Sequence, residues 1–312
     1  MNKTDRFSNS RTFYENEVAP MIHGRFPQFE DRIAVGIAGE GSDCFGYDDL
    51  ISRDHDFGTG VCLWLTDEDY DKIANMLSIA YTELVNRHDA GLSERLMQRR
   101  GVMRIHDFYS DILAVDCDVK NCVMTDDKWH LLDHSCLATA VNGEVFKDNL
   151  GVFSAFRKLL LNYYPDNIRR ERLAGAMHTF SACLQVNYAR CMSRGDLVAA
   201  SICKSRGLEA AMELFFLIKR VYPPYYKWTY RALRELDTDG AVADLLDSLA
   251  RAGISTLPWL DKKYNPDILN KDDEVIVLSE EIASQLIKEL NASGIVKGHD
   301  PYLERYVDDV LK

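Results

Sequence analysis

The sequence lacks the features that would place it in a membrane or outside the cell. Its first dozen residues contain no apolar stretch of the kind a secretion signal needs. Leu214–Ile218 is among the longest uninterrupted apolar runs, and it is far too short to cross a bilayer. The eight cysteines include no CxxC pair, and several lie in apolar helical patterns where a reduced thiol packs as a small hydrophobe. We therefore expect a cytoplasmic protein with free thiols and no membrane partner.

Positive charge is also scarce over most of the chain. There are 37 Lys and Arg against 49 Asp and Glu, a net charge of -12 that opposes binding to a polyanion. We therefore expect no nucleic-acid partner. The exception is the segment 166–235, where twelve Lys and Arg accompany six Asp and Glu. This basic segment either faces an anionic ligand or forms ordinary solvated helix faces.

The hydrophobic pattern changes character near residue 150. Before that point it predicts a helix over 11–25, strands over 32–38, 60–65 and near 102–108, and helices over 67–86 and 126–138. Thr66 is the expected N-cap of the helix over 67–86. After the Asn142-Gly143 turn it predicts helices almost throughout, at 149–163, 167–193, 196–221, 224–236, 239–252 and 276–291. We expect an α+β fold in which residues 1–150 form a mixed sheet with flanking helices and residues 151–312 form a helical bundle.

Acidic residues gather in the segment between the first two predicted strands, GEGSDCFGYDDLISRDHDFG at 39–58. Asp54 and Asp56 are two residues apart, so at the start of a strand both carboxylates project from one face. Carboxylates this close repel each other unless a cation intervenes, and Mg²⁺ suits a site with few protein ligands. Gly41 and Ser42 end the preceding strand, where backbone N–H groups and a hydroxyl can approach a phosphate. The segment suits a metal-bound nucleoside triphosphate.

The pair Gly41-Ser42, eleven intervening residues and then Asp54-His55-Asp56 resemble the signature of the nucleotidyltransferase superfamily. With Gly46, Asp48-Asp49 and Ser52-Arg53 added, the pattern resembles the uncharacterised, nucleotidyltransferase-like family DUF4037. Further similarity to that family lies at 143–148, 164–166 and 222–228. The resemblance covers most of residues 11–235.

The resemblance implies a nucleotidyltransferase-type sheet and a transfer reaction. A nucleoside monophosphate would pass from an NTP, with ATP the expected nucleotide, to a small-molecule or protein acceptor while pyrophosphate leaves. Mg²⁺ held by Asp54 and Asp56 would neutralise the triphosphate. Such enzymes usually add a third carboxylate from a later strand; Asp107 is the preferred candidate, followed by Glu144 and Asp148. Without a third acid the chain would be a catalytically silent nucleotide-binding or toxin–antitoxin partner module.

An aromatic segment, Tyr222–Trp228, contains a lysine directly after two prolines. Lys227 should lie in the first turn of a new helix, where exposed N–H groups and the helix dipole favour an anion. We expect it to contact the β- or γ-phosphate of the NTP. The alternative is that the aromatic residues pack the domain and Lys227 is solvated.

Two further patterns are weaker. His130 and His134 share one face of the helix predicted over 126–138 and would form half of a zinc site, but no other ligands accompany them. Arg172 and His178 fit the loose Arg-x5-His pattern of the HEPN ribonucleases. We expect ordinary surface histidines and no ribonuclease activity.

Overall fold

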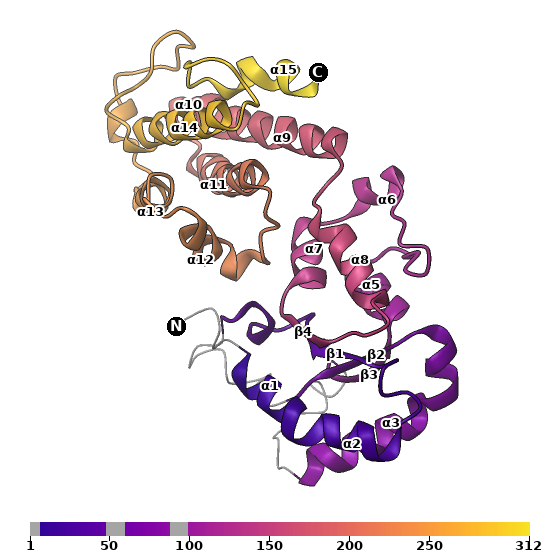
Figure 1. Cartoon of the computed structure of the whole chain (residues 1–312). Coiled ribbons are helices and arrows are strands. Elements are labelled where there is room, and N and C mark those ends of the chain that lie inside the picture. Colours follow the sequence, from indigo (N-terminus) through magenta and orange to yellow (C-terminus); the bar gives the residue numbers. More distant parts are fainter. Residues whose placement is uncertain (1–6, 48–59, 88–98) are drawn as a thin grey trace. The chain divides into compact units, whose positions relative to one another are not determined.

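The chain divides into two compact units, residues 1–163 and 164–312, in a computed structural model that describes residues 7–47, 60–87 and 99–312. The described strands form a mixed sheet in the first unit, and the second unit is built from helices and loops (Figure 1). The expected α+β class is confirmed. The helix that follows residue 150 packs against the sheet and therefore counts with the first unit.

Four strands make up the sheet within the described residues, in the order β3-β2-β1-β4. Their bounds are β1 Ala34–Ile37, β2 Cys62–Leu65, β3 Gly101–Arg104 and β4 Glu144–Lys147. β1 runs antiparallel to both neighbours, whereas β2 and β3 are parallel. The third strand ends at Arg104 instead of continuing to 108, and β4 was not predicted. Every residue of β4 is only partly buried, so this strand lacks the apolar run that marks β1 and β2.

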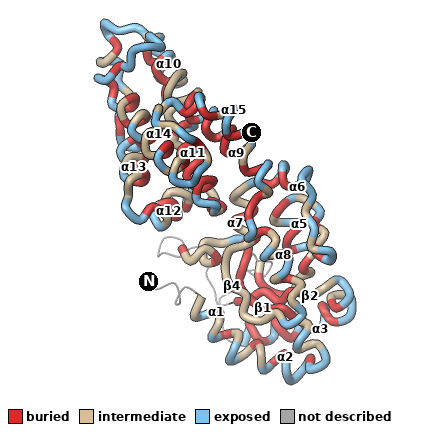
Figure 2. The backbone as a smooth tube through the Cα atoms, turned by 45° about the horizontal axis from the view of Figure 1, so that its top comes forward, coloured by how far each residue is buried: buried red, intermediate tan, exposed pale blue. Residues whose placement is uncertain are grey.

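Helices cover both faces of the sheet. On one face lie α1 Ser8–Phe13, the π-helical segment Tyr14–Val18, α2 Ala19–Arg25 and α3 Asp67–Arg87; on the other lie α5 Ile105–Leu113, α7 His134–Val141 and α8 Val152–Leu161. Strand alternation decides which side chain meets which layer. Val35 and Leu63 enter the core with α2 and α3, whereas Trp64 turns the other way and stacks on Phe153, with ring centroids 3.8 Å apart. Figure 2 shows the buried residues along β1 and β2.

The helix predicted over 126–138 is in fact two helices, α6 Asp126–Leu131 and α7. The backbone is extended at Leu132 and Asp133, and the Asp133 carboxylate caps α7 by accepting a hydrogen bond from the Ser135 N–H. His130 and His134 therefore do not share one helix face. The half-site for zinc suggested by their spacing is wrong.

The second unit follows the predicted helices closely. It comprises α9 Asp166–Phe180, the π-helical segment Ser181–Asn187, α10 Tyr188–Arg194, α11 Leu197–Lys219, α12 Tyr226–Leu236, α13 Ala243–Arg251, α14 Glu274–Ala292 and α15 Val307–Leu311. α11 packs along α9 and beside α14, and buries Phe215 and Phe216. Across the described part of the chain, every helix is too short or too polar to span a bilayer.

Candidate functional site

The chain leaves β1 through a tight turn that contains Gly41 and Ser42. The Ser42 carbonyl accepts hydrogen bonds from the N–H groups of Phe45 (3.2 Å) and Tyr47 (2.9 Å), which closes a 3₁₀ turn over 43–45. Gly41 has φ = +119°, and a Cβ there would lie 2.3 Å from Asp43 Oδ1, so no other residue fits without strain. The Gly41 N–H donates to no described partner. The turn thus brings the Gly41-Ser42 backbone to the end of β1, with the Asp43 carboxylate beside Gly41.

A buried arginine, Arg100, holds this turn in place through hydrogen bonds. Arg100 is only 2% exposed; its guanidinium donates to Asp43 Oδ2 (2.8 Å) and to the backbone oxygens of Ala38 (3.5 Å) and Arg99 (3.2 Å), and Nη2 lies 2.9 Å from Cys44 Sγ. Burial alone would lower the pKa of Arg100, but its neighbours, Asp43 among them, raise that pKa above its ordinary value. The turn is therefore held by a charged, fully enclosed group that also fixes the end of β1.

Two buried thiols complete the packing around this arginine. The Cys44 Sγ lies 3.6 Å from the Glu40 carbonyl oxygen, and the Cys62 Sγ lies 3.7 Å from the Ala38 carbonyl oxygen. Burial raises the pKa of both thiols, so they are neutral at physiological pH. All eight cysteines lie within the described residues and none is paired, which confirms the expected free thiols.

The turn before β4 is tied to the same strand end. The Asn142 side chain accepts a hydrogen bond from the Gly39 N–H (2.8 Å) and donates one to the Gly39 carbonyl (2.7 Å). Gly143 has φ = +68°, and a Cβ there would lie 1.9 Å from the Ile37 carbonyl oxygen, so the Asn142-Gly143 turn crosses directly over the end of β1. Two turns far apart in sequence are thereby locked together.

The Asp-x-Asp pair, Asp54 and Asp56, lies outside the described residues. The pairing of β1 with β2 nevertheless shows at which edge of the sheet β2 begins. Gly36 near the end of β1 is paired with Cys62 at the start of β2. Gly60 and Val61, the first described residues after that segment, therefore precede β2 at the sheet edge where the Gly41-Ser42 turn lies.

Asp107 does not lie at that edge. Cys62 and Gly101 are register partners at the start of β2 and β3, and Leu65 and Arg104 at their end. Asp107 follows Arg104, in the first turn of α5, so the length of a strand, roughly 10 Å, separates it from the turn edge. Its Oδ1 lies 3.0 Å from His106 Nδ1.

The other two candidate acids have different positions. Asp148 caps α8, accepting hydrogen bonds from the N–H groups of Gly151 (2.9 Å) and Ser154 (2.8 Å). Glu144 is the register partner of Ile37, the last residue of β1, and its carboxylate is paired with Arg11. Of the three candidates, Glu144 is the one at the edge of the Gly41-Ser42 turn.

A cavity of about 850 Å³ opens at the opposite edge, beyond the ends of β2 and β3. His106 stands in its wall and bridges two carboxylates, with Nδ1 3.0 Å from Asp107 and Nε2 2.9 Å from Asp116. Hydrogen bonds to Asp107 and Asp116 raise the pKa of His106. This arrangement was not predicted from the sequence, because a helix turn and a loop bring its members together and no short motif marks them.

Lys227 lies where the sequence predicted, in the first turn of α12. Its ammonium is 5.8 Å from the Tyr225 ring centroid and 5.3 Å from that of Trp228. Arg231 approaches the Trp228 ring as well, at 5.3 Å, and the indole N–H donates to the Tyr225 hydroxyl (2.9 Å). The aromatic residues thus both pack the second unit and hold two cations against one ring.

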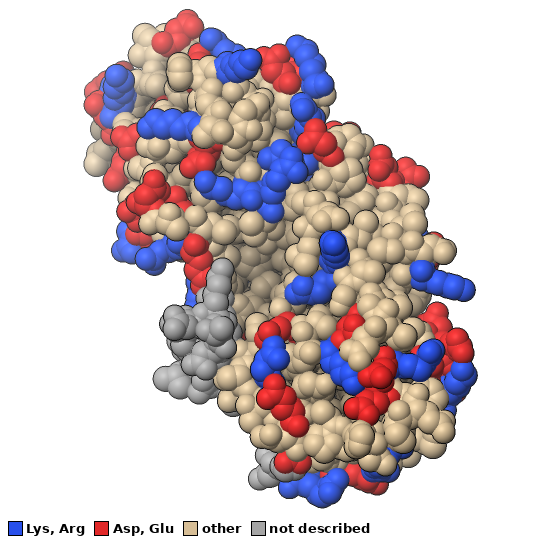
Figure 3. Space-filling model, viewed as in Figure 1, with Lys and Arg blue, Asp and Glu red and all other residues tan. Residues whose placement is uncertain are grey.

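The basic segment 166–235 owes part of its charge to structural roles. Arg169 is buried and donates to the carbonyls of Leu217 (3.0 Å) and Ile218 (3.4 Å) near the end of α11. Lys219 is paired with Glu289 at 2.7 Å. Figure 3 shows that acidic side chains are interspersed with the Lys and Arg of this unit. Part of the positive charge of this segment is therefore used in contacts within the second unit.

Arg172 and His178 engage separate partners. The Arg172 guanidinium lies over the Tyr164 ring, 4.7 Å from its centroid. His178 Nδ1 lies 2.9 Å from the Glu304 carboxylate. Both residues have structural partners, and this arrangement adds no support to a ribonuclease role.

Residues 129–229 match the family model described as a domain of unknown function, DUF4037. This supports the DUF4037 resemblance over that part of the chain, which includes Asn142, Gly143 and Lys227. The matched range begins after the Gly41-Ser42 turn and the Asp-x-Asp pair. Among the curated proteins and the solved structures, nothing matches the chain.

Proposed function

We propose that the protein is a Mg²⁺-dependent nucleotidyltransferase that moves a nucleoside monophosphate from an NTP, with ATP the expected nucleotide, to a small-molecule or protein acceptor in the cytoplasm. The observation that carries this proposal is the Gly41-Ser42 turn. It ends a buried strand, is fixed from below by Arg100, and lies at the edge where the Asp54-x-Asp56 segment leads into β2. Backbone N–H groups held in a rigid turn can bind a phosphate group.

Each residue of the site would have a distinct task. The Gly41 N–H and the Ser42 hydroxyl would bind phosphate oxygens of the NTP, and Asp54 and Asp56 would hold Mg²⁺ through oxygen ligands. The donor set fits this ion, because carboxylates are hard ligands and the two acids are spaced to share one strand face. Bound Mg²⁺ would neutralise the charge of the triphosphate and help pyrophosphate to leave. Lys227 would add a charge for the β- or γ-phosphate from the second unit.

We prefer Glu144 as the third acid, because it lies beside the end of β1. Its place beside the end of β1 suits a general base for the acceptor, provided that its carboxylate exchanges Arg11 for the acceptor hydroxyl or amine. Asp107, preferred from the sequence, begins a helix at the other end of the strands.

The reaction is tested with ATP labelled at the α-phosphate, offered with Mg²⁺ to panels of aminoglycosides, nucleotides and proteins. Label on an acceptor together with released pyrophosphate supports transfer. A protein that binds ATP tightly and labels no acceptor in a broad panel would overturn the assignment as an enzyme.

One observation favours a second candidate, a catalytically silent nucleotide-binding or toxin–antitoxin partner module. Within the described residues, the start of β3 carries Arg99 and Arg100 and no carboxylate, and Glu144 is engaged by Arg11. If Glu144 stays with Arg11 when nucleotide binds, the site would hold an NTP and not turn it over.

A further inference from the structure

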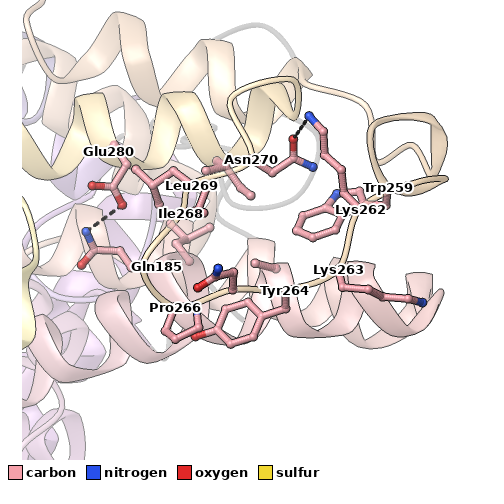
Figure 4. A pocket seen from close by; sticks show the side chains of 14 residues that line it. Gln185, Trp259, Lys262, Lys263, Tyr264, Pro266, Ile268, Leu269, Asn270 and Glu280 are labelled. Atoms are coloured by element: carbon pink, nitrogen blue, oxygen red, sulfur yellow. Dashed lines mark hydrogen bonds between the residues drawn. The ribbon is translucent and has the colours of Figure 1, made fainter.

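The second unit contains a partly open cavity of about 340 Å³ that the nucleotide site does not use. One side of it is formed by α14 and by the π-helical segment 181–187, and the other by the loop 259–270 (Figure 4). Most of the wall is apolar or aromatic: Leu184, Trp259, Tyr264, Ile268, Leu269 and Ile276. A cavity of this size with an apolar wall suits a small organic molecule.

One carboxylate stands in this apolar wall. Glu280 Oε1 accepts a hydrogen bond from Gln185 Nε2 at 3.0 Å. Gln185 is itself fixed, because its Nε2 donates to the Pro301 carbonyl (3.0 Å) and its Oε1 accepts from the Leu303 N–H (3.2 Å). Because the Gln185 amide oxygen already accepts from Leu303, the amide nitrogen is the group that faces Glu280. Its N–H orients the Glu280 carboxylate.

The residue that orients this carboxylate comes from a helix irregularity. Leu184 and Gln185 both line the cavity and both lie in the π-helical segment between α9 and α10. π-Helical turns are rare and are frequently found at functional sites. Here the widened turn is the element that supplies the support for Glu280.

The charge near Glu280 is predominantly negative. Burial and the charge of Asp300 raise the pKa of the Glu280 carboxyl. Glu280 also borders a second, more open hollow, whose charged lining comprises the acids Asp239, Asp244 and Glu281 and one cation, Lys271. A positively charged ligand group would relieve this accumulation of negative charge.

The lysines of the loop do not neutralise Glu280. Lys262 donates to Asn270 Oδ1 at 2.9 Å and is paired with Asp272. Lys263 extends away from the other labelled side chains (Figure 4). Within the described part of the chain, Gln185 is the hydrogen-bond partner of the Glu280 carboxylate.

We propose that this cavity binds a small organic amine, with its ammonium group on Glu280 and its apolar or aromatic body against Trp259, Tyr264 and Ile276. The cavity shares no residue with the proposed nucleotide site. An ammonium ion supplies the donors and the charge that Glu280 lacks, and the aromatic rings favour a cation-bearing, apolar ligand.

The test is calorimetric titration of the full chain with phenethylamine, 2-phenylethanol and phenylacetate, three probes that share a body and differ in charge. We expect saturable binding of phenethylamine and affinities at least tenfold weaker for the other two. Glu280→Gln, which keeps the shape and can still accept from Gln185, should weaken phenethylamine binding about tenfold or more. Glu274→Gln, which changes an exposed carboxylate of the same helix that lines neither this cavity nor the second hollow, is the matched control and should bind like the wild type.

A second variant guards against misfolding of Glu280→Gln. Leu269 is a half-exposed residue of the loop, so Leu269→Trp should fill the cavity from its rim and abolish phenethylamine binding while the melting temperature is kept. The proposal is overturned if phenethylamine does not bind, if 2-phenylethanol or phenylacetate binds as tightly, or if Leu269→Trp and a folded Glu280→Gln both bind like the wild type.

Discussion

Asn142 holds both backbone polar groups of Gly39, accepting from its N–H at 2.8 Å and donating to its carbonyl at 2.7 Å. This pair joins the Gly41-Ser42 turn to the turn that begins β4, two segments far apart in sequence. The first lies outside the DUF4037 match and the second inside it. The link makes the matched region part of the support for the proposed phosphate-binding turn.

Replacing Asn142 should therefore loosen the turn. Asn142→Ala removes two hydrogen bonds and should lower the free energy of unfolding by about 1–3 kcal/mol, with a weaker affinity for Mg-ATP. Urea denaturation and calorimetry check the two effects. Asn121→Ala, at an exposed loop position of the same unit, is the control. Equal losses of stability and affinity in both variants would show that Asn142 has no special role in holding the turn.

Arg100 and Asp43 should behave as a coupled buried pair. Arg100→Met leaves the Asp43 carboxylate without its guanidinium and should cost about 3–5 kcal/mol of stability. Adding Asp43→Asn should recover part of this loss, because the unpaired charge is then gone. A double-mutant cycle in urea measures the coupling, and strictly additive effects would mean that the pair does not hold the turn.

Glu144 and Asp107 lie at opposite ends of the strands, and their variants test which of them is the third acid. Glu144→Gln should lower turnover by about a hundredfold or more, as for loss of a general base, with ATP affinity largely kept. Asp107→Asn should leave turnover nearly unchanged. Single-turnover rates at saturating ATP decide between them; the reverse ranking would restore Asp107 as the catalytic carboxylate.

His106 should make stability depend on pH. Because hydrogen bonds to Asp107 and Asp116 raise its pKa in the folded state, its contribution is fully present below the unfolded pKa of about 6.5 and is lost as the pH rises through the folded value. The melting temperature of wild type should exceed that of His106→Gln at pH 5.5 by more than at pH 8.5. A pH-independent difference would show that the ion pairs add nothing. The effect is small because the imidazole is well exposed.

Lys227 is tested by comparing two ligands. Lys227→Met should weaken ATP binding about tenfold or more and leave AMP binding nearly unchanged, because a charge-assisted contact to the β- or γ-phosphate is lost. Arg231→Met removes the other cation from the same Trp228 ring and is the matched control. An unchanged ratio of ATP to AMP affinity in Lys227→Met would make Lys227 a packing residue only.

Local pattern predicted most of the helices and the first two strands, since apolar periodicity and caps such as Thr66 are encoded in neighbouring residues. Local sequence pattern did not predict the features that depend on contacts between residues distant in sequence. β4 is a strand because β1 pairs with it, and Asp133 divides a helix that periodicity alone would continue. The Gly41-Ser42 turn was found as a motif, but its supports, Arg100 and Asn142, are distant in sequence and carry no motif of their own. Asp107 was misplaced because the third strand was extended past Arg104.

The central claim is that Asp54 and Asp56 bind a metal-bound triphosphate beside the Gly41-Ser42 turn. Calorimetric titration of ATP, with and without Mg²⁺, into wild type, Asp54→Asn, Asp56→Asn and the control Asp67→Asn tests it most directly. Asp67 is an exposed carboxylate at the other end of β2. We expect Mg²⁺-dependent binding in wild type and Asp67→Asn, and its loss in both of the other variants while they stay folded. Wild-type affinity in folded Asp54→Asn and Asp56→Asn, or ATP binding that does not depend on Mg²⁺, would contradict it.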